Sequence, residues 1–121
     1  MEMGYLVDIY YVEDTKEHIL GTIAVDVSSD WTRFPRYGFV AEFDNYSGTI
    51  DKYANIEEEM KYLNRLHING VQFQDWHWKH HRPVKFDENG NFVAWYQDVS
   101  NRWIGTEYVK KYIEVQHRYG M

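Results

Sequence analysis

The sequence predicts an α/β protein in which a β-hairpin is followed by two βα units. Two apolar, β-branched runs on either side of a polar turn occupy residues 4–27. Two further short apolar runs occur later, at residues 38–43 and 70–76, and a segment with helical periodicity follows each of them. Strands that alternate with helices pair in parallel, with each helix lying over one face of the sheet.

The hairpin is predicted from "GYLVDIYYVEDTKEHILGTIAVDV", residues 4–27, in which the polar turn is residues 13–18. Runs rich in Val, Ile and Tyr that flank a polar turn are typical of two antiparallel strands. The following segment, "SSDWTRFPRY", has no sustained period and predicts a connector. We interpret its aromatic and arginine residues mainly as packing at a domain junction, with arginines that bind carboxylates and backbone carbonyls.

The first βα unit begins with a short buried strand, "GFVAEF", at residues 38–43. A helix over residues 55–70 follows, with Asn55 as the N-cap candidate and Gly70 as the stop signal. Its apolar side is formed by Ile56, Met60 and Leu63. The acids at positions 57–59 suit the first helical turn, and we expect them to form a solvated face.

The second unit has a strand, "GVQFQDW", at residues 70–76 and a final helix at residues 107–121. We expect a long loop between them, residues 77–105, in which Asn89-Gly90 marks a turn. Thr106 is the expected N-cap of the helix. The side of this helix expected to be buried carries Val109, Tyr112, Ile113 and Gln116.

Composition limits the classes of function. The chain has 121 residues, enough for one domain with a core, and a formal net charge of -6, which argues against a nucleic-acid partner. No cysteine is present, so disulfides and thiolate metal sites are excluded. No run of 18 apolar residues or signal-like start occurs, so we expect no membrane association and leave the localisation open. The aromatic fraction of 18% is high.

Acidic and aromatic residues follow both strands of the βα units. Asp75 and Trp76 end the second strand, while Glu42, Asp44 and then Asn45 and Tyr46 follow the first. The carboxyl ends of parallel strands meet at one edge, where ligands commonly bind. A carboxylate accepts sugar hydroxyls, and an indole stacks on the apolar face of a sugar ring. The alternative, in which Asp75 caps the next loop and Trp76 lies in the core, stays open.

The three histidines at positions 77, 80 and 81 allow a second hypothesis, because with Asp75 they could provide three or four zinc ligands. Pro83 and the neighbouring Lys79 and Arg82 instead favour an irregular basic loop. We favour the loop interpretation and expect no metal and no cofactor.

Three segments resemble successive motifs of glycoside hydrolase family 66, the family of endo-dextranases and cycloisomaltooligosaccharide glucanotransferases. They are "DVSSDWTRFPRYGF" at residues 26–39, "INGVQFQDWHWKHHRPV" at residues 68–84 and "YIEVQHRYGM" at residues 112–121. Motifs of this length, in the family's order, are far more specific than a short pattern. Gln74 departs from the resemblance, since an aromatic residue is expected there.

The resemblance implies an immunoglobulin-like β domain followed by a (β/α)8 barrel. Residues 1–30 would be the last hairpin of the β domain, and residues 31–121 would be the first quarter of the barrel, its strands one and two with their helices. The family cleaves α-1,6-glucan with retention or cyclises it, using an Asp nucleophile and a Glu acid/base. We expect both beyond Met121, so no catalytic residue is expected in this chain, which alone should be inactive. Members are typically secreted or at the bacterial cell surface.

The implied ligand is α-1,6-glucan or an isomaltooligosaccharide, and Asp75 would lie beside the cleaved sugar without being the nucleophile. An autonomous carbohydrate-binding module and a metal-binding or interaction protein are the alternatives. Unpaired sheet edges also predict self-association as a homodimer or domain-swapped oligomer. The candidate substrate-binding residues are Asp75, Trp76, Tyr37, Glu42, Trp78 and His80.

Overall fold

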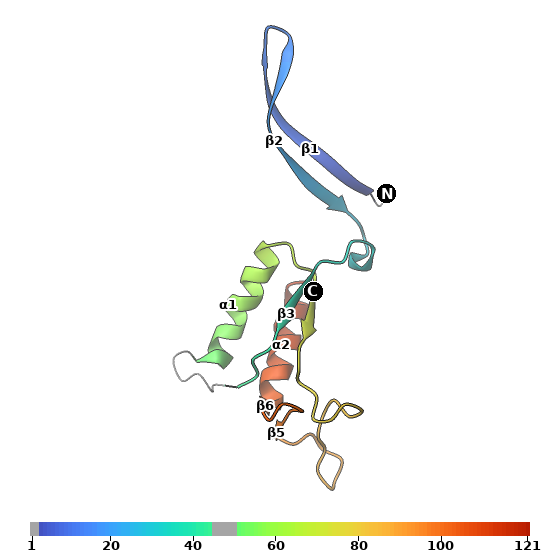
Figure 1. Ribbon diagram of the computed structural model, residues 1–121, viewed down its shortest axis with the longest axis vertical. Helices are drawn as coiled ribbons and strands as arrows, with labels where there is room; N and C mark the ends of the chain where they lie inside the picture. Colours follow the sequence, from blue (N-terminus) through green and yellow to red (C-terminus); the bar gives the residue numbers. More distant parts are fainter. Residues whose placement is uncertain (1–2, 45–50) are drawn as a thin grey trace. The chain divides into compact units, whose positions relative to one another are not determined.

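The computed structural model describes residues 3–44 and 51–121, and its chain divides into two compact units, Met1–Pro35 and Arg36–Met121. The described residues form two α-helices and three two-stranded sheets. Figure 1 shows them coloured in chain order. The predicted α/β class is confirmed at this level. The division lies close to the expected boundary at residue 30, while the assignment of the first unit to an immunoglobulin-like domain stays a prediction.

The first unit is the predicted β-hairpin. Strand β1 (Met3–Glu13) pairs antiparallel with β2 (Lys16–Val27), and the register has one irregularity between Ile9 and Tyr10. The turn is two residues, shorter than expected, because Asp14 and Thr15 both adopt positive φ angles of 52° and 67°. Two-residue turns with both central residues at positive φ match the twist of the flanking strands.

The expected connector contains one short 3-10 helix, η1 (Trp31–Arg33). Asp30 begins it, since its carboxylate accepts hydrogen bonds from the backbone N–H of Thr32 at 3.0 Å and from the Thr32 hydroxyl at 2.7 Å. These bonds hold the pKa of Asp30 below its usual value.

The second unit is built on the predicted parallel pair. Strands β3 (Tyr37–Val40) and β4 (Gly70–Phe73) pair in parallel from Tyr37↔Gly70 to Val40↔Phe73. Both strands end three residues before the expected positions. The helix between them, α1 (Lys52–Arg65), begins earlier than predicted.

The expected N-cap of α1, Asn55, is wrong. The Asp51 carboxylate accepts the backbone N–H of Ala54 at 3.1 Å, which places Asn55 inside the first turn. The end of α1 also differs, because Leu66 is the C-cap and Gly70 already belongs to β4.

The expected loop over residues 77–105 contains a hairpin that the sequence did not predict. Its strands are β5 (Trp95–Gln97) and β6 (Trp103–Gly105), and helix α2 (Thr106–Arg118) follows directly. Three-residue strands are too short for alternation to stand out from the surrounding residues. The expected cap Thr106 is also wrong: Gly105 is the N-cap, and the Thr106 hydroxyl donates to the carbonyl of Val93 at 2.5 Å.

The core lies in the second unit, where residues from the strands and both helices meet. Ile113 was expected on the buried side of α2 but is exposed, and Tyr108 and Val115 are buried with Val109, Tyr112 and Gln116. The largest fully buried side chains are Tyr112, Phe43, Ile56, Met60, Ile104 and Val115. No helix among residues 3–44 and 51–121 is long and apolar enough to cross a membrane.

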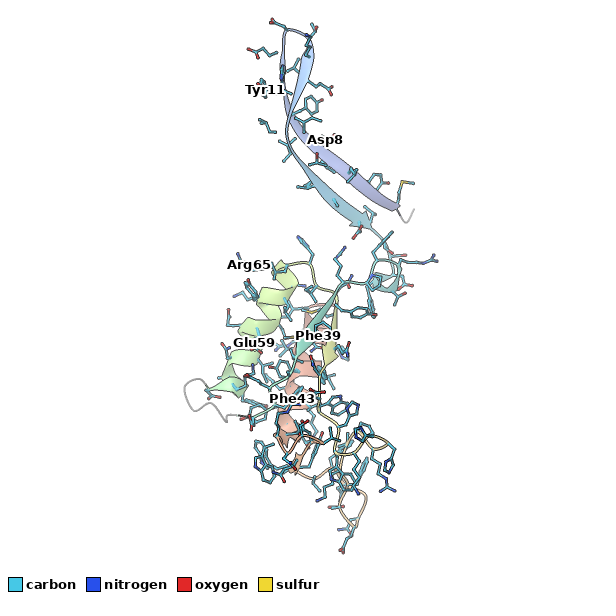
Figure 2. The ribbon with its side chains drawn as sticks, in the orientation of Figure 1. Asp8, Tyr11, Phe39, Phe43, Glu59 and Arg65 are labelled. Atoms are coloured by element: carbon cyan, nitrogen blue, oxygen red, sulfur yellow. The ribbon has the colours of Figure 1, made fainter. Side chains whose placement is uncertain are left out.

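The acids of α1 do not form the uniformly solvated face that we expected. Helix α2 packs against α1, and the buried hydroxyl of Tyr112 donates to Glu59 at 2.6 Å. Figure 2 shows Glu59 on helix α1. Glu57 pairs with Arg118 of α2, which leaves Glu58 on the solvent side with Lys61 at 3.4 Å. Burial and the Glu59 bond raise the pKa of Tyr112.

Candidate functional site

The carboxyl ends of β3 and β4 lie at the same edge of their sheet. The ladder ends at Val40↔Phe73, and the N–H of Gln74 then donates to the carbonyl of Val40 at 2.8 Å. Glu42 and Asp44 therefore follow one strand where Asp75 follows the other. Asn45 and Tyr46, which we expected to join this patch, lie outside the described residues.

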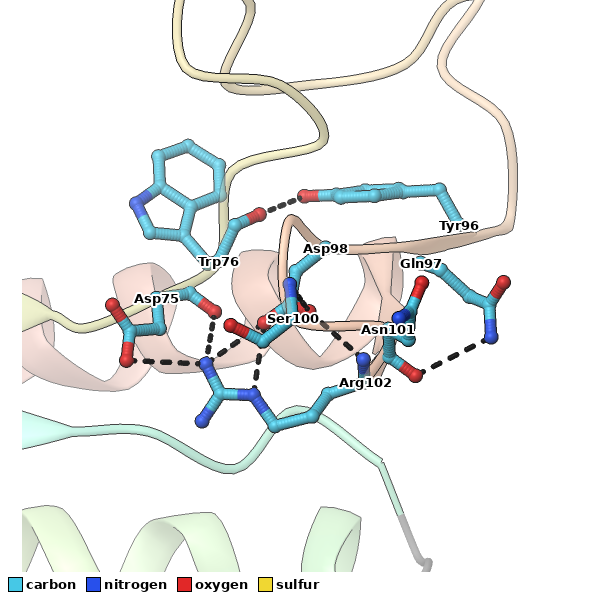
Figure 3. Close-up of polar contacts among 8 residues, drawn as sticks. All are labelled: Asp75, Trp76, Tyr96, Gln97, Asp98, Ser100, Asn101 and Arg102. Carbon is cyan, nitrogen blue, oxygen red and sulfur yellow. Dashed lines mark hydrogen bonds and ion pairs between the residues drawn. The ribbon is translucent and has the colours of Figure 1, made fainter.

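Asp75 has a left-handed backbone conformation, with φ 51°. Aspartate is among the few residues that adopt this geometry readily. Nη2 of Arg102 binds it twice, donating to the main-chain carbonyl at 2.9 Å and lying 3.3 Å from Oδ2 of the carboxylate (Figure 3). The Asp75 side chain is still 54% exposed, so this carboxylate is held in place and open to solvent.

Arg102 is itself held by Asp98, whose side chain has no exposed surface. Oδ2 of Asp98 accepts from Nε at 2.9 Å and from Nη2 at 2.8 Å, while Oδ1 accepts the backbone N–H groups of Ser100 and Arg102 at 2.8 Å each (Figure 3). A buried carboxylate needs such partners to offset its loss of hydration. The order Asp98, Arg102, Asp75 is thus a chain of charges leading from the interior to the surface.

Trp76 is half-buried and packs against the core. Its ring meets Phe73 edge to face, with centroids 6.1 Å apart, and its carbonyl accepts the Tyr96 hydroxyl at 2.8 Å (Figure 3). Burial, with a smaller contribution from the negative charge of Asp98, raises the pKa of Tyr96 to about 12. Trp76 therefore packs against the core, and its predicted part in binding a sugar stays a prediction.

The histidine loop is a compact basic turn. Lys79 and Arg82 exchange two backbone hydrogen bonds of 3.0 Å, which leaves His80 exposed between them. Trp78 is half-buried, and the Nζ atoms of Lys79 and Lys85 lie 4.5 and 5.6 Å from its ring centre. Within residues 3–44 and 51–121, no three His, Asp or Glu side chains are grouped to hold a metal ion.

A hollow of about 590 Å³ lies at the carboxyl end of β3, and Glu42, Asp44 and Arg102 line it. Arg102 thereby joins the hollow to Asp75. Tyr37, another candidate, is the first residue of β3 and so lies at the opposite end of the strand. The full lining consists of Ala41, Glu42, Phe43, Asp44, Asn101, Arg102, Trp103 and Ile104.

Sequence reasoning missed Arg102, Asp98 and Tyr96. The segment "YQDVSNRW" did contain a signal, because Asp followed by Ser and Asn is typical of a turn closed by an aspartate side chain. The contact of Arg102 with Asp75 had no signal, since 27 positions separate the two residues.

An α/β unit with acids and aromatics at the carboxyl ends of parallel strands belongs to the class in which ligands bind at that edge. The sequence matches the profile of glycosyl hydrolase family 66 over residues 2–121. The chain therefore belongs to glycosyl hydrolase family 66.

Curated relatives agree with this assignment. A cycloisomaltooligosaccharide glucanotransferase of Niallia circulans is 33% identical over 97 residues, which are 80% of this chain and 10% of that protein. A dextranase of Streptococcus salivarius is 30% identical over 122 residues, covering 97% of this chain and 14% of the dextranase. The chain thus spans only a small part of the length of the relatives it matches.

The fold agrees as well. A crystal structure of a Paenibacillus sp. cycloisomaltooligosaccharide glucanotransferase complexed with cycloisomaltoheptaose superposes with a TM-score of 0.69 at 32% identity. The match covers 97% of this chain and 16% of that one. The similarity to the family that the sequence motifs indicated is confirmed.

Proposed function

We propose that this chain forms part of the glucan-binding cleft of a family 66 enzyme and binds α-1,6-linked glucan or isomaltooligosaccharide through Asp75. The observation that carries the proposal is the anchored, half-exposed carboxylate of Asp75 at the carboxyl end of β4. The names of the relatives, a dextranase and two glucanotransferases, support a glucan as the ligand.

The chemistry of Asp75 suits a sugar hydroxyl. An ionised carboxylate has about four acceptor positions on its two oxygens. Arg102 lies on the Oδ2 side, and the exposed remainder of the carboxylate can accept a hydroxyl. Because Arg102 is fixed by the buried Asp98, the acceptor is oriented before any sugar arrives, which lowers the ordering cost of binding.

The parallel pair β3 and β4 corresponds in this proposal to strands one and two of a (β/α)8 barrel. The parallel register, the helix between the strands and the similarity to the Paenibacillus enzyme support it. In such barrels the catalytic groups come from the ends of several different strands. Two strands alone supply a portion of the binding surface.

We further propose that the chain binds glucan without cleaving it. Retaining cleavage needs two carboxyl groups about 5–5.5 Å apart, both facing the sugar. Asp75 and Asp98 contact the same guanidinium, but Asp98 has no exposed surface and so does not face a substrate. Asp98 instead orients Asp75, because it holds the arginine that binds Asp75.

Affinity electrophoresis of the purified chain in native gels containing dextran tests this function, beside an assay for reducing ends released from dextran. We expect retardation that grows with dextran concentration and no release of reducing ends. A folded chain that migrates identically with and without dextran contradicts the binding proposal. If reducing ends are released at the same rate by the wild type and by the Asp75→Asn variant, the assigned role of Asp75 is contradicted.

The β1–β2 hairpin favours a second candidate function, self-association. An isolated two-stranded hairpin is only marginally stable in water, and among the described residues β1 and β2 pair only with each other. Large apolar side chains such as Leu6 and Leu20 are exposed on them. We propose a homodimer that covers this surface, and sedimentation velocity tests it: a monomer at all concentrations contradicts this candidate, and loss of dimer in Leu6→Ser supports it.

A further inference from the structure

The β5–β6 hairpin has one buried face and one exposed face. Its register pairs Trp95 with Gly105, Tyr96 with Ile104 and Gln97 with Trp103. Side chains alternate between faces along a strand. Tyr96 and Ile104 are accordingly buried, whereas Trp95 and Trp103 lie on the other face with 48% and 49% of their surface exposed.

Trp95 is fixed in orientation although half of it is exposed. A Cβ on Gly105 would lie 2.8 Å from Cη2 and Cζ3 of the indole, so the Trp95 ring lies directly over this glycine. Its ring also contacts the Tyr108 ring, at 5.7 Å between centroids. Trp103 is the diagonal neighbour of Trp95 on the same face of the hairpin, because Trp95 is paired with Gly105.

Asp44 adds a carboxylate to these two indoles. Asp44, Trp95 and Trp103 line one open hollow of about 470 Å³. Asp44 and Trp103 also line the larger hollow that contains Glu42 and Arg102. The surface is therefore continuous from Trp95 to the guanidinium that binds Asp75.

Half-exposed indoles on a rigid support, with a carboxylate in the same hollow, match the chemistry of a hexose. The apolar face of the sugar ring stacks on an indole, and the hydroxyls at its rim donate to a carboxylate. We propose that Trp95, Trp103 and Asp44 form a second sugar subsite, which binds a glucosyl unit of the same glucan at a distance from Asp75. This inference rests on the proposed function and extends the cleft along the β5–β6 hairpin.

Nuclear magnetic resonance of the ¹⁵N-labelled chain titrated with isomaltoheptaose tests the subsite, because each of the 5 tryptophans gives one indole N–H signal. Single Trp→Phe variants assign the signals. We expect the signals of Trp95 and Trp103 to shift with one common binding curve, and that of Trp31 to stay in place. Unshifted signals of Trp95 and Trp103 in a chain that binds the sugar overturn the inference.

Affinity measurements on variants provide an independent test. We expect Trp103→Ala to weaken binding of isomaltoheptaose about 10-fold, from the loss of one stacking contact and the apolar area buried with it. Trp103→Phe retains an aromatic face and should therefore lose less affinity for isomaltoheptaose than Trp103→Ala. Phe92→Ala is the matched control, since Phe92 is a similarly exposed aromatic residue outside both hollows and should leave affinity unchanged.

The outcomes separate this inference from the proposed function. If the wild type binds and Asp75→Asn weakens binding while Trp103→Ala behaves like Phe92→Ala, the subsite is wrong and the function stands. If Trp103→Ala weakens binding while Asp75→Asn does not, the subsite stands and the role of Asp75 is wrong. No binding by the folded wild type overturns both. A changed sedimentation coefficient of Trp103→Ala with unchanged affinity identifies the surface as a contact between copies and overturns the subsite.

Discussion

Arg102 binds Asp75 through a single nitrogen, Nη2, which donates to the carbonyl at 2.9 Å and approaches the carboxylate at 3.3 Å. The same nitrogen lies 2.8 Å from the buried carboxylate of Asp98. The conformation of Asp75, the candidate sugar acceptor just beyond β4, therefore depends on Arg102, which is separated from α2 only by the short strand β6. Substitution of Asp75 or of Asp98, the two partners of Arg102, should therefore change both the free energy of unfolding and the affinity for a sugar.

Arg102→Ala should lower the free energy of unfolding by about 1–3 kcal/mol, because the buried Asp98 loses its cation but keeps two backbone donors. The half-exposed position of Arg102 keeps the loss below that of a wholly buried pair. Urea unfolding measures the change. Lys61→Ala, which removes the exposed pair with Glu58, is the control and should change stability by less than about 0.5 kcal/mol. Equal effects of the two substitutions contradict the account of Asp98.

Asp75→Ala and Asp75→Asn should differ in stability although both remove the charge. Asparagine tolerates the left-handed conformation at φ 51°, whereas alanine is strained there by about 1–2 kcal/mol. Thermal or urea unfolding should show Asp75→Ala as the less stable variant. Equal stabilities mean that the backbone relaxes at this position. Asp75→Asn is thus the variant suited to binding experiments.

Tyr96 should make stability depend on pH at alkaline values. Its pKa in the folded chain is raised to about 12 from 10.0, so the folded state favours the protonated hydroxyl. This contribution is fully present below pH 10 and is lost as the pH rises through about 12. The difference in unfolding free energy between the wild type and Tyr96→Phe should therefore shrink over this window. A Tyr96→Phe difference that stays constant with pH is the contrary result.

Gly105→Ala should destabilise the β5–β6 hairpin by about 1–3 kcal/mol, since overpacking forces neighbouring rings out of place. The new Cβ would lie 2.6 Å from Cδ2 of Tyr108 and 2.8 Å from the Trp95 ring. Unfolding measurements give the energy, and the tryptophan emission spectrum reports displacement of Trp95. Gly21→Ala is the control, because no atom beyond its two chain neighbours lies within 4 Å of the added group. A stable Gly105→Ala chain with an unchanged spectrum contradicts the packing of Trp95.

The elements with a sustained hydrophobic period were predictable from the sequence. The first hairpin, the parallel pair and both helices have at least four residues of consistent pattern, and their existence was predicted correctly. The helix caps were harder to predict, because Asp51 and Asn55 are both good N-cap residues and the choice between them depends on where α1 packs. Strands β5 and β6 have three residues each and were missed.

The candidate site was predictable only in part, for a related reason. The place of Asp75 follows from the end of β4, which the period of that strand indicates. Arg102 becomes the partner of Asp75 only because the β5–β6 segment folds back onto the end of β4. The hydrogen bond from the Tyr96 hydroxyl to the Trp76 carbonyl joins these two segments. Such contacts between distant segments leave no local pattern, so Arg102 and the indoles of the hairpin emerged only from the structure.

A calorimetric titration of the wild type and of Asp75→Asn with an isomaltooligosaccharide tests the central claim most directly. The account predicts saturable binding to the wild type and binding weakened about 10-fold or more by Asp75→Asn, because a neutral amide is a poorer acceptor for a sugar hydroxyl than a charged carboxylate. Circular dichroism confirms in parallel that both chains are folded. A folded wild type that gives no binding heat, or equal affinities for the two chains, would contradict the account.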